Sequence, residues 1–184
     1  MVNLWLAVGI PGSGKSTYIR KEIRNKNGIR ISRDVIRFAL IEDNEDYFAK
    51  EKLVFKEFIN QIQNAINSKI LNIYVDATHL NEKSRNKILD KLNLDNVQIH
   101  ILYFDIPLNI CLARNSLRTG REKVPEDTIV EMYSKLTKPD FHEKYTYSTI
   151  NIVDENNKIT YIEGIMNEKI IKNKEIKNIF IERI

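Results

Sequence analysis

The stretch GIPGSGKS, which runs from Gly9 to Ser16, says most about how this chain folds. It fits the pattern G-x-x-x-x-G-K-[ST], in which a glycine-rich turn joins a strand to a helix and binds phosphate groups. Gly9, Gly12 and Gly14 allow backbone conformations that a Cβ atom disfavours, so successive N–H groups can point at phosphate oxygens. An apolar run precedes the stretch and a helical pattern follows it. The stretch therefore predicts a phosphate-binding loop.

The side chains of this loop predict which part of a nucleotide it binds. Lys15 can reach the β- and γ-phosphates of ATP, and the Ser16 hydroxyl can ligate Mg²⁺. The positive end of the helix dipole adds to the attraction for phosphate. Ser13 and Thr17 complete the predicted nucleotide-binding set. The alternative is a glycine-rich turn between strand and helix that binds no ligand.

The rest of the chain alternates short apolar runs with helical stretches. Strands are expected at about 3–8, 28–32, 71–78, 97–104 and 147–153, and helices at about 16–24, 35–41, 47–67, 82–92, 106–118 and 125–136. This alternation predicts an α/β fold of the P-loop NTPase type, with a mostly parallel five-stranded sheet and helices on both faces. We expect a single domain over residues 1–184, in which the tail from about 154 to 184 has no assignment.

Composition narrows the classes of protein without naming a substrate. The formal net charge of +4 is compatible with an anionic partner. The single cysteine, Cys111, has no disulfide partner in the chain and excludes a cysteine-based zinc cluster. No apolar stretch reaches the roughly 18 to 20 residues that span a bilayer, and the N-terminal apolar run lacks the features of a signal peptide. We expect a cytoplasmic protein; the oligomeric state is open.

Three charged residues, Arg33, Asp34 and Arg37, follow the second expected strand, in GIRISRDVIRFAL. Ligands of such sheets bind at the carboxyl ends of the strands, where Asp34 could accept the proton of an acceptor hydroxyl. Arg37 lies three residues further on, near the same helix face, and could hold a phosphate by a bidentate contact. The alternative is that Ser32 or Asp34 caps the helix while Arg37 is solvated.

A basic segment, LARNSLRTGREKVP (residues 112–125), predicts a lid over the nucleotide. Arg114 and Arg118 are four residues apart, so on one helix their guanidinium groups share a face. Two like charges on one face repel each other, but an anion between them would make the arrangement favourable. Arg121 and Lys123 add charge on a short loop, and arginines brought onto a transferring phosphate can accelerate the reaction by orders of magnitude. We call residues 112–125 the basic lid. The alternative is a solvated basic helix end.

Further candidates are weaker. Asp76 ends an apolar strand and could be a direct or indirect partner of Mg²⁺, or could hydrogen-bond the following turn. His79 is expected to be a loop residue and not a catalyst. Arg85 could face substrate phosphates or solvent. Tyr47 and Phe48 lie where bases could stack, although core packing competes with that role.

Absent motifs exclude several nucleotide-binding classes. The chain lacks the N-K-x-D and D-x-x-G motifs of GTPases and the L-S-G-G-Q segment of transporter ATPases. What remains is the pattern of a compact kinase.

Four segments in order, GIPGSGKST, ISRDVIR, VDATHLNEKSR and FDIPLNICLARNSLRTGREKVPEDTIVEMY, resemble the polynucleotide 5′-hydroxyl kinase family. That family includes the phage-type end-healing kinase and the kinase module of bacterial RNA-repair enzymes. The resemblance covers about residues 3–138 and implies ATP- and Mg²⁺-dependent phosphorylation of a 5′-hydroxyl end of RNA or DNA. It makes Asp34 the general base, Arg37 the ligand of the phosphate beside the acceptor sugar, and Arg118, supported by Arg114, the lid arginine on ATP.

The chain departs from larger members of that family. It has no D-x-D-G-T phosphatase signature and no K-x-D-G ligase signature, so we expect the kinase unit alone. Two other functions stay open: a small-molecule kinase for a nucleoside, sugar or antibiotic, and a nucleotide-dependent binding module without transfer. The sequence does not distinguish RNA from DNA.

Overall fold

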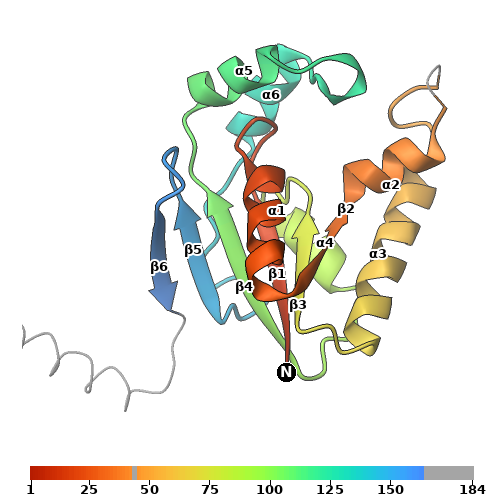
Figure 1. Cartoon of the computed structure of the whole chain (residues 1–184), viewed down its shortest axis with the longest axis vertical. Helices are drawn as coiled ribbons and strands as arrows, with labels where there is room; N and C mark the ends of the chain where they lie inside the picture. The colour runs from red at the N-terminus through yellow and green to blue at the C-terminus, as the bar shows by residue number, and fades with distance from the viewer. Residues whose placement is uncertain (43–44, 164–184) are drawn as a thin grey trace, which may run out of the picture.

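A computed structural model of the chain describes residues 1–42 and 45–163 (Figure 1). Its strands form one sheet in the order β2-β3-β1-β4-β5-β6. The bounds are β1 Val2–Val8, β2 Gly28–Ser32, β3 Asn72–Asp76, β4 Val97–Phe104, β5 Thr149–Val153 and β6 Ile159–Glu163. The first five strands pair in parallel, and β6 pairs with β5 in the antiparallel sense. The predicted α/β class with a mostly parallel sheet is confirmed.

The expected number of five strands was wrong. The sixth strand, β6, lies in the segment from about 154 onwards that the sequence left unassigned. A tight turn joins it to β5: the Asp154 N–H donates to the Lys158 carbonyl, and Asn157 has a positive φ of 60°. A two-strand hairpin at a sheet edge needs no crossover helix, so the strand–helix alternation did not announce it. The rest of the unassigned tail, residues 164–184, lies outside the described residues.

The helices lie where the apolar periodicity places them. Their bounds are α1 Lys15–Lys26, α2 Arg33–Leu40, α3 Glu51–Asn67, α4 Glu82–Leu89, α5 Leu108–Ser116 and α6 Glu126–Ser134, with the short 3₁₀ helix η1 Gly120–Glu122. Asn81 caps helix α4: its side chain accepts from the Ser84 N–H, and the Ser84 hydroxyl accepts from the Asn81 N–H. The α3 helix begins later than the predicted residue 47, because a turn precedes it.

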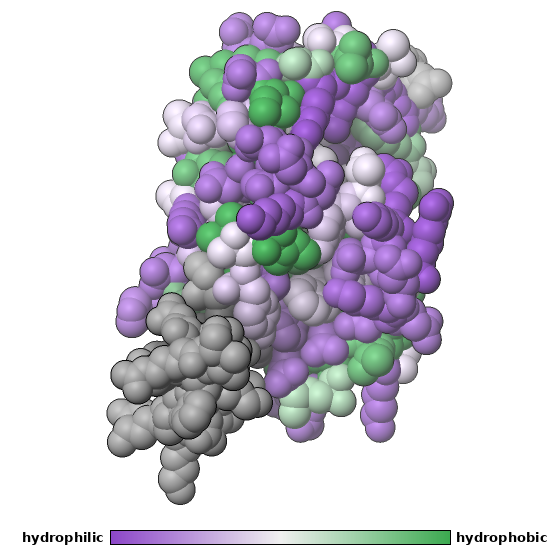
Figure 2. All heavy atoms as spheres, turned by 60° about the vertical axis from the view of Figure 1, so that its left-hand side comes forward, coloured by the Kyte–Doolittle hydropathy of each residue, from purple (hydrophilic) through white to green (hydrophobic). Residues whose placement is uncertain are grey.

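Two apolar layers cover the sheet, one on each face. Leu4 and Leu6 of β1 pack with α3 and α4, whereas Ala7 of the same strand packs with α1, α5 and α6. This division follows from the alternation of side chains along a strand. Figure 1 shows α1 in front of the sheet and α4 behind it. Figure 2 shows that the face around β6 is mostly hydrophilic, with small separate hydrophobic patches.

Among the described residues, no helix is both long enough and apolar enough to cross a lipid bilayer. Cys111 is a buried free thiol on α5, and burial raises its pKa.

Arg85 lies in neither of the environments that the sequence left open. Its side chain is fully buried: Nε donates to the Glu143 carboxylate at 2.9 Å, Nη2 donates to the same carboxylate, and Nη1 donates to the His79 carbonyl at 3.0 Å. The Tyr147 hydroxyl donates to Glu143 at 2.6 Å. These bonds fasten the segment before β5 to the start of α4. Arg85 is therefore a structural residue.

Replacing Arg85 by alanine is expected to lower the free energy of unfolding by about 3–5 kcal/mol, because Glu143 is left as an unpaired buried carboxylate. Chemical denaturation measures the change. The control is Arg24→Ala on the exposed end of α1, which should change stability by no more than about 0.5 kcal/mol. A loss no larger than that of Arg24→Ala would contradict the assignment.

Candidate active site

The glycine-rich loop joins β1 to α1 at the carboxyl edge of the sheet. Gly9, Gly12 and Gly14 all have positive φ angles, and Gly14 is the N-cap of α1. A Cβ atom on Gly12 would lie 2.3 Å from the carbonyl oxygen of Cys111, so this glycine allows the loop to touch the backbone of α5. The predicted loop context, strand before and helix after, is present.

Lys15 is buried inside the loop. Its side chain donates to the Ile10 carbonyl at 2.8 Å and to Ser13 Oγ at 3.3 Å. Burial lowers the pKa of Lys15 to about 8, while the carboxylates of Asp76 and Asp34 act in the opposite direction. A bound anion would raise the pKa of Lys15 toward its ordinary value and so increase the fraction of the lysine that is protonated. Ser16 and Thr17 follow it in the first turn of α1, Ser16 half-buried and Thr17 exposed.

Several of the predicted site residues converge on Lys15. Asp34 from α2, Asp76 from the end of β3 and Arg118 from the basic lid are all near enough to act on its pKa. They come from distant parts of the sequence, and the parallel strand order brings them to one edge of the sheet. Figure 1 shows α5 and α6 above the loop and α2 at its side.

The arginines of the basic lid are arranged differently from the prediction. Arg114 lies at the loop: its Nη1 would be 3.6 Å from a Cβ on Gly14. Arg118 does not share the α5 helix with it, because α5 ends at Ser116; its Nη1 donates instead to the Glu122 carbonyl at 3.4 Å. The expectation of one helical face for the two guanidinium groups was wrong. Both nevertheless remain beside the phosphate-binding loop.

Asn115 explains why the helix ends there. Its side chain is fully buried, its Nδ2 donates to the Val124 carbonyl at 2.7 Å, and its Oδ1 accepts from the Val124 N–H at 3.1 Å. This pair of bonds closes the lid between its two ends, so the chain must leave the helix after Ser116. Sequence reasoning missed Asn115, although an asparagine between charged residues on a helix was a visible anomaly.

Arg121 reaches across to α2. Its Nη2 donates to the Phe38 carbonyl at 3.1 Å and its Nη1 to the Ile41 carbonyl at 3.5 Å, while its guanidinium lies 4.7 Å from the Phe38 ring. Its positive charge thus offsets the partial negative charge of the carbonyl groups at the end of α2. The sequence placed Arg121 among the ATP-binding residues; in the structure it joins the basic lid to the end of α2.

The sequence left open whether Ser32 or Asp34 caps α2, and the structure decides between them. Ser32, and not Asp34, caps α2, because its side chain accepts from the Val35 N–H. The Asp34 carboxylate is 64% exposed, and its Oδ1 accepts from Arg37 Nη1 and from the Tyr47 hydroxyl, each at 2.7 Å. The side chain is oriented by two donors and remains open to solvent.

Arg37 is buried and not solvated. Besides Asp34 it donates to Glu51 at 2.7 Å and to the Tyr47 oxygen at 2.8 Å. Burial tends to raise the pKa of Glu51, but the hydrogen bonds and charges of Arg37 and Arg33 outweigh this, so that pKa is lowered. Glu51 was not singled out from the sequence; it lies at the start of α3, far from the charged motif.

Asp76 is tied to the neighbouring strand. Its Oδ2 accepts from Arg30 at 2.6 Å, and Arg30 also donates to Ser32 Oγ at 3.1 Å. Among the described residues no group of three His, Cys, Asp or Glu could hold a metal ion. A hydroxyl and a carboxylate, those of Ser16 and Asp76, still fit Mg²⁺, which keeps waters and takes further ligands from nucleotide phosphates. Mg²⁺ there would neutralise charge on the phosphates.

His79 is buried and neutral. Its Nδ1 hydrogen-bonds the Ala7 carbonyl at 2.7 Å, and burial lowers its pKa to about 4. It ties the end of β1 to the segment after β3. It lies in the loop after β3, as expected.

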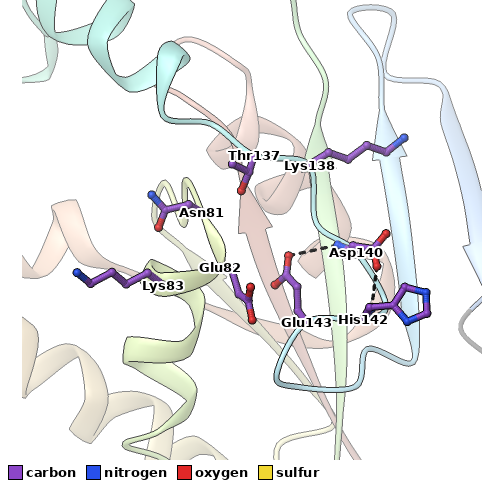
Figure 3. Close-up of a pocket in the computed structure, with 8 residues that line it drawn as sticks. All are labelled: Asn81, Glu82, Lys83, Thr137, Lys138, Asp140, His142 and Glu143. Carbon is purple, nitrogen blue, oxygen red and sulfur yellow. Dashed lines mark hydrogen bonds between the residues drawn. The ribbon is translucent and has the colours of Figure 1, made fainter.

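A hollow of about 460 Å³ lies elsewhere, between the start of α4 and the segment after α6 (Figure 3). Its lining carries both charges, and the predicted site residues are absent from it. It is lined by Asn81, Glu82, Lys83, Thr137, Lys138, Asp140, His142 and Glu143. Because Asn81 caps α4 and Glu143 pairs with Arg85, two of its polar groups already have partners.

A family model described as an AAA domain (AAA_33) matches residues 4–139. The chain belongs to this family. Its sheet and phosphate-binding loop are those of the P-loop kinases, a scaffold that binds nucleotide. This AAA_33 chain is also 24% identical over 119 residues to the Arabidopsis thaliana protein named Transcription factor bHLH140. The match covers 64% of this chain and 12% of that protein. The chain thus spans a small part of that relative's length.

Two solved structures share the fold of this AAA_33 domain. A chain of the Pnkp1/Rnl/Hen1 RNA repair complex has a TM-score of 0.65 and 23% identity, covering 91% of this chain and 50% of that one. An unliganded sugar kinase from Janibacter sp. HTCC2649 has a TM-score of 0.61 and 14% identity, covering 84% of this chain and 86% of that one. At these identities the likeness shows the fold alone.

Gly12→Ala is expected to abolish nucleotide binding, because its Cβ would overlap the Cys111 carbonyl and displace either the loop or α5. Titration with a fluorescent ATP analogue measures the nucleotide affinity. The control is Gly120→Ala: it also has a positive φ, but no atom lies within 4 Å of the new Cβ. That variant should lose only about 1–2 kcal/mol of stability from backbone strain and keep its affinity. Equal affinities in both variants would contradict the loop geometry.

Nucleotide affinity is expected to fall as the pH rises above about 8. In the free protein burial lowers the pKa of Lys15 to about 8, whereas bound phosphates would raise it, so binding takes up a proton above that pH. The Kd should rise by up to about tenfold per pH unit until the pKa of the complex is reached. Calorimetry in buffers of different ionisation enthalpy measures both quantities. Lys15→Met should bind weakly with a flat profile; a flat wild-type profile would refute the linkage.

Proposed function

We propose that the protein is an ATP-dependent polynucleotide kinase that phosphorylates the 5′-hydroxyl end of RNA or DNA. The observation that carries the proposal is the Asp34 carboxylate: exposed, held by two donors, and within the electrostatic reach of Lys15. A general base needs this combination of access and orientation. The likeness to a chain of an RNA repair complex supports the same choice of acceptor.

Each residue then has one chemical role. Asp34 accepts the proton of the 5′-hydroxyl. The oxygen of that hydroxyl forms a bond to the γ-phosphorus of ATP, while the bond from the γ-phosphorus to the β–γ bridging oxygen breaks and ADP leaves. Lys15 and the loop N–H groups hold the β- and γ-phosphates. Arg114 and Arg118 approach from the lid and neutralise the charge on the transferring group. Ser16 and Asp76 are the protein groups that would hold Mg²⁺.

Arg37 requires a revised role. The resemblance gave it the phosphate next to the acceptor sugar, but in the structure its Nη1 donates to Asp34 and Tyr47 and its Nη2 donates to Glu51. We therefore assign it first to the orientation of Asp34.

A second candidate function is phosphorylation of a small alcohol such as a sugar. The sugar kinase from Janibacter matches over most of both chains, and its fold is the same. The difference between the two candidates is the acceptor, since the nucleotide side of the reaction is common to both.

Asp34→Ala is expected to lower transfer to a 5′-hydroxyl oligonucleotide by about 10²- to 10⁴-fold, because the acceptor loses its base. Affinity for ATP should stay within a few-fold of wild type. End-labelling with ATP and Mg²⁺, on paired RNA and DNA oligonucleotides, measures the rate. The control is Asp95→Ala, an exposed carboxylate in the loop before β4.

A panel of sugars and nucleosides, assayed by ADP release, tests the second candidate with the same variants. Activity on such a compound and on no strand would overturn the polynucleotide assignment. Equal labelling by wild type and Asp34→Ala would remove Asp34 from the chemistry, and ATP binding without turnover on any acceptor would point to a binding module.

A further inference from the structure

Three aromatic rings gather beside the proposed base. Tyr47 lies edge-on to Phe38, with ring centroids 6.1 Å apart, and edge-on to Phe48, with centroids 4.9 Å apart. The Tyr47 hydroxyl donates to Asp34 Oδ1 at 2.7 Å. The cluster therefore begins one hydrogen bond away from the carboxylate that would receive the acceptor's proton.

The rings differ in how much of their surface is free. The guanidinium of Arg121 covers Phe38, and that of Arg37 lies 4.3 Å from the centre of the Tyr47 ring. Phe48 is 61% exposed although it lies only 5.8 Å from the Arg37 guanidinium. The expectation that Tyr47 and Phe48 pack in the core is thus wrong for both, since Tyr47 is exposed as well. A phenylalanine with an open face next to a charged site lacks a structural explanation in the described residues.

We propose that Phe48, supported by Tyr47, is the stacking subsite for the nucleobase of the 5′-terminal nucleotide. This inference rests on the proposed function and names the acceptor more closely: an unpaired strand end whose first base is free to stack. Every base has a flat π-face, so such a platform binds without regard to sequence. Only the ribose separates the 5′-hydroxyl from its base, which matches a platform that borders the catalytic carboxylate.

Other occupants fit the same rings less well. A sugar or polyol is held mainly by hydrogen bonds, and a phenylalanine side chain offers none. A protein partner needs a buried area far larger than two side chains provide, on the order of 800 Å² per partner. A base needs only the ring, and the guanidinium of Arg37 behind the aromatic pair adds electrostatic attraction to the π-system.

The decisive experiment is a cycle that changes the protein and the substrate separately. One oligonucleotide carries a normal 5′-terminal nucleotide; the other carries an abasic one with the same 5′-hydroxyl. For wild type, loss of the base should raise KM by roughly 5- to 100-fold, the equivalent of one stacking contact. Phe48→Ala should raise KM for the normal strand by a similar factor and should not distinguish the two strands. Phe48→Trp should restore the preference, and Phe48→Leu should not.

A binding measurement separates stacking from transfer. With 2-aminopurine as the 5′-terminal base, wild type should quench its fluorescence and Phe48→Ala should not. The matched control is Tyr161→Ala, which removes an exposed aromatic ring from β6 at the opposite edge of the sheet and should behave as wild type in both assays. Thermal unfolding confirms that each variant is folded.

The outcomes distinguish this inference from the function on which it rests. If wild type phosphorylates both strands and the abasic change has the same effect in wild type and in Phe48→Ala, the stacking subsite is refuted while the kinase stands. If wild type phosphorylates no strand end, the polynucleotide function fails and the subsite fails with it.

Discussion

The close approach of the glycine-rich loop to the backbone of α5 is the constraint on which the rest of the site depends. The Cys111 carbonyl occupies the space that a side chain at position 12 would fill, so the loop and α5 are in direct contact. Because the basic lid begins in the second half of α5, this contact also determines where the lid lies. Arg114 then meets the loop at Gly14, on the side where phosphates would be held. The lid is thus placed by a steric condition at one glycine.

The charges around the loop are arranged so that the protein tolerates them without a nucleotide. Lys15 is buried, but the nearby carboxylates of Asp34 and Asp76 offset part of the cost of its desolvation. Asp34 is in turn held by Arg37, whose charge is shared with Glu51. These pairings balance the opposite charges around the loop and fix the side chains in place.

The sequence predicted those features that depend on neighbouring residues. The loop, its flanking strand and helix, and the capping of α4 follow from patterns a few residues long. It could not predict features that join distant segments. Arg85 finds Glu143 after 58 residues, and the end of α5 depends on a bond from Asn115 to Val124. The positions of Asp34 and Asp76 near Lys15 were predictable only in outline, from the rule that parallel strands end at one edge.

The lid joins the two halves of the proposed reaction in one short segment. Asn115 closes its base through Val124, Arg114 and Arg118 lie toward the loop, and Arg121 reaches the last carbonyls of α2. The carboxylate of Asp34 lies in the first turn of that same helix. A displacement of the lid would therefore move the cations around the phosphates and the support of α2 together. The basic residues of the lid therefore point two ways, toward the loop and toward α2, and do not form one helical face.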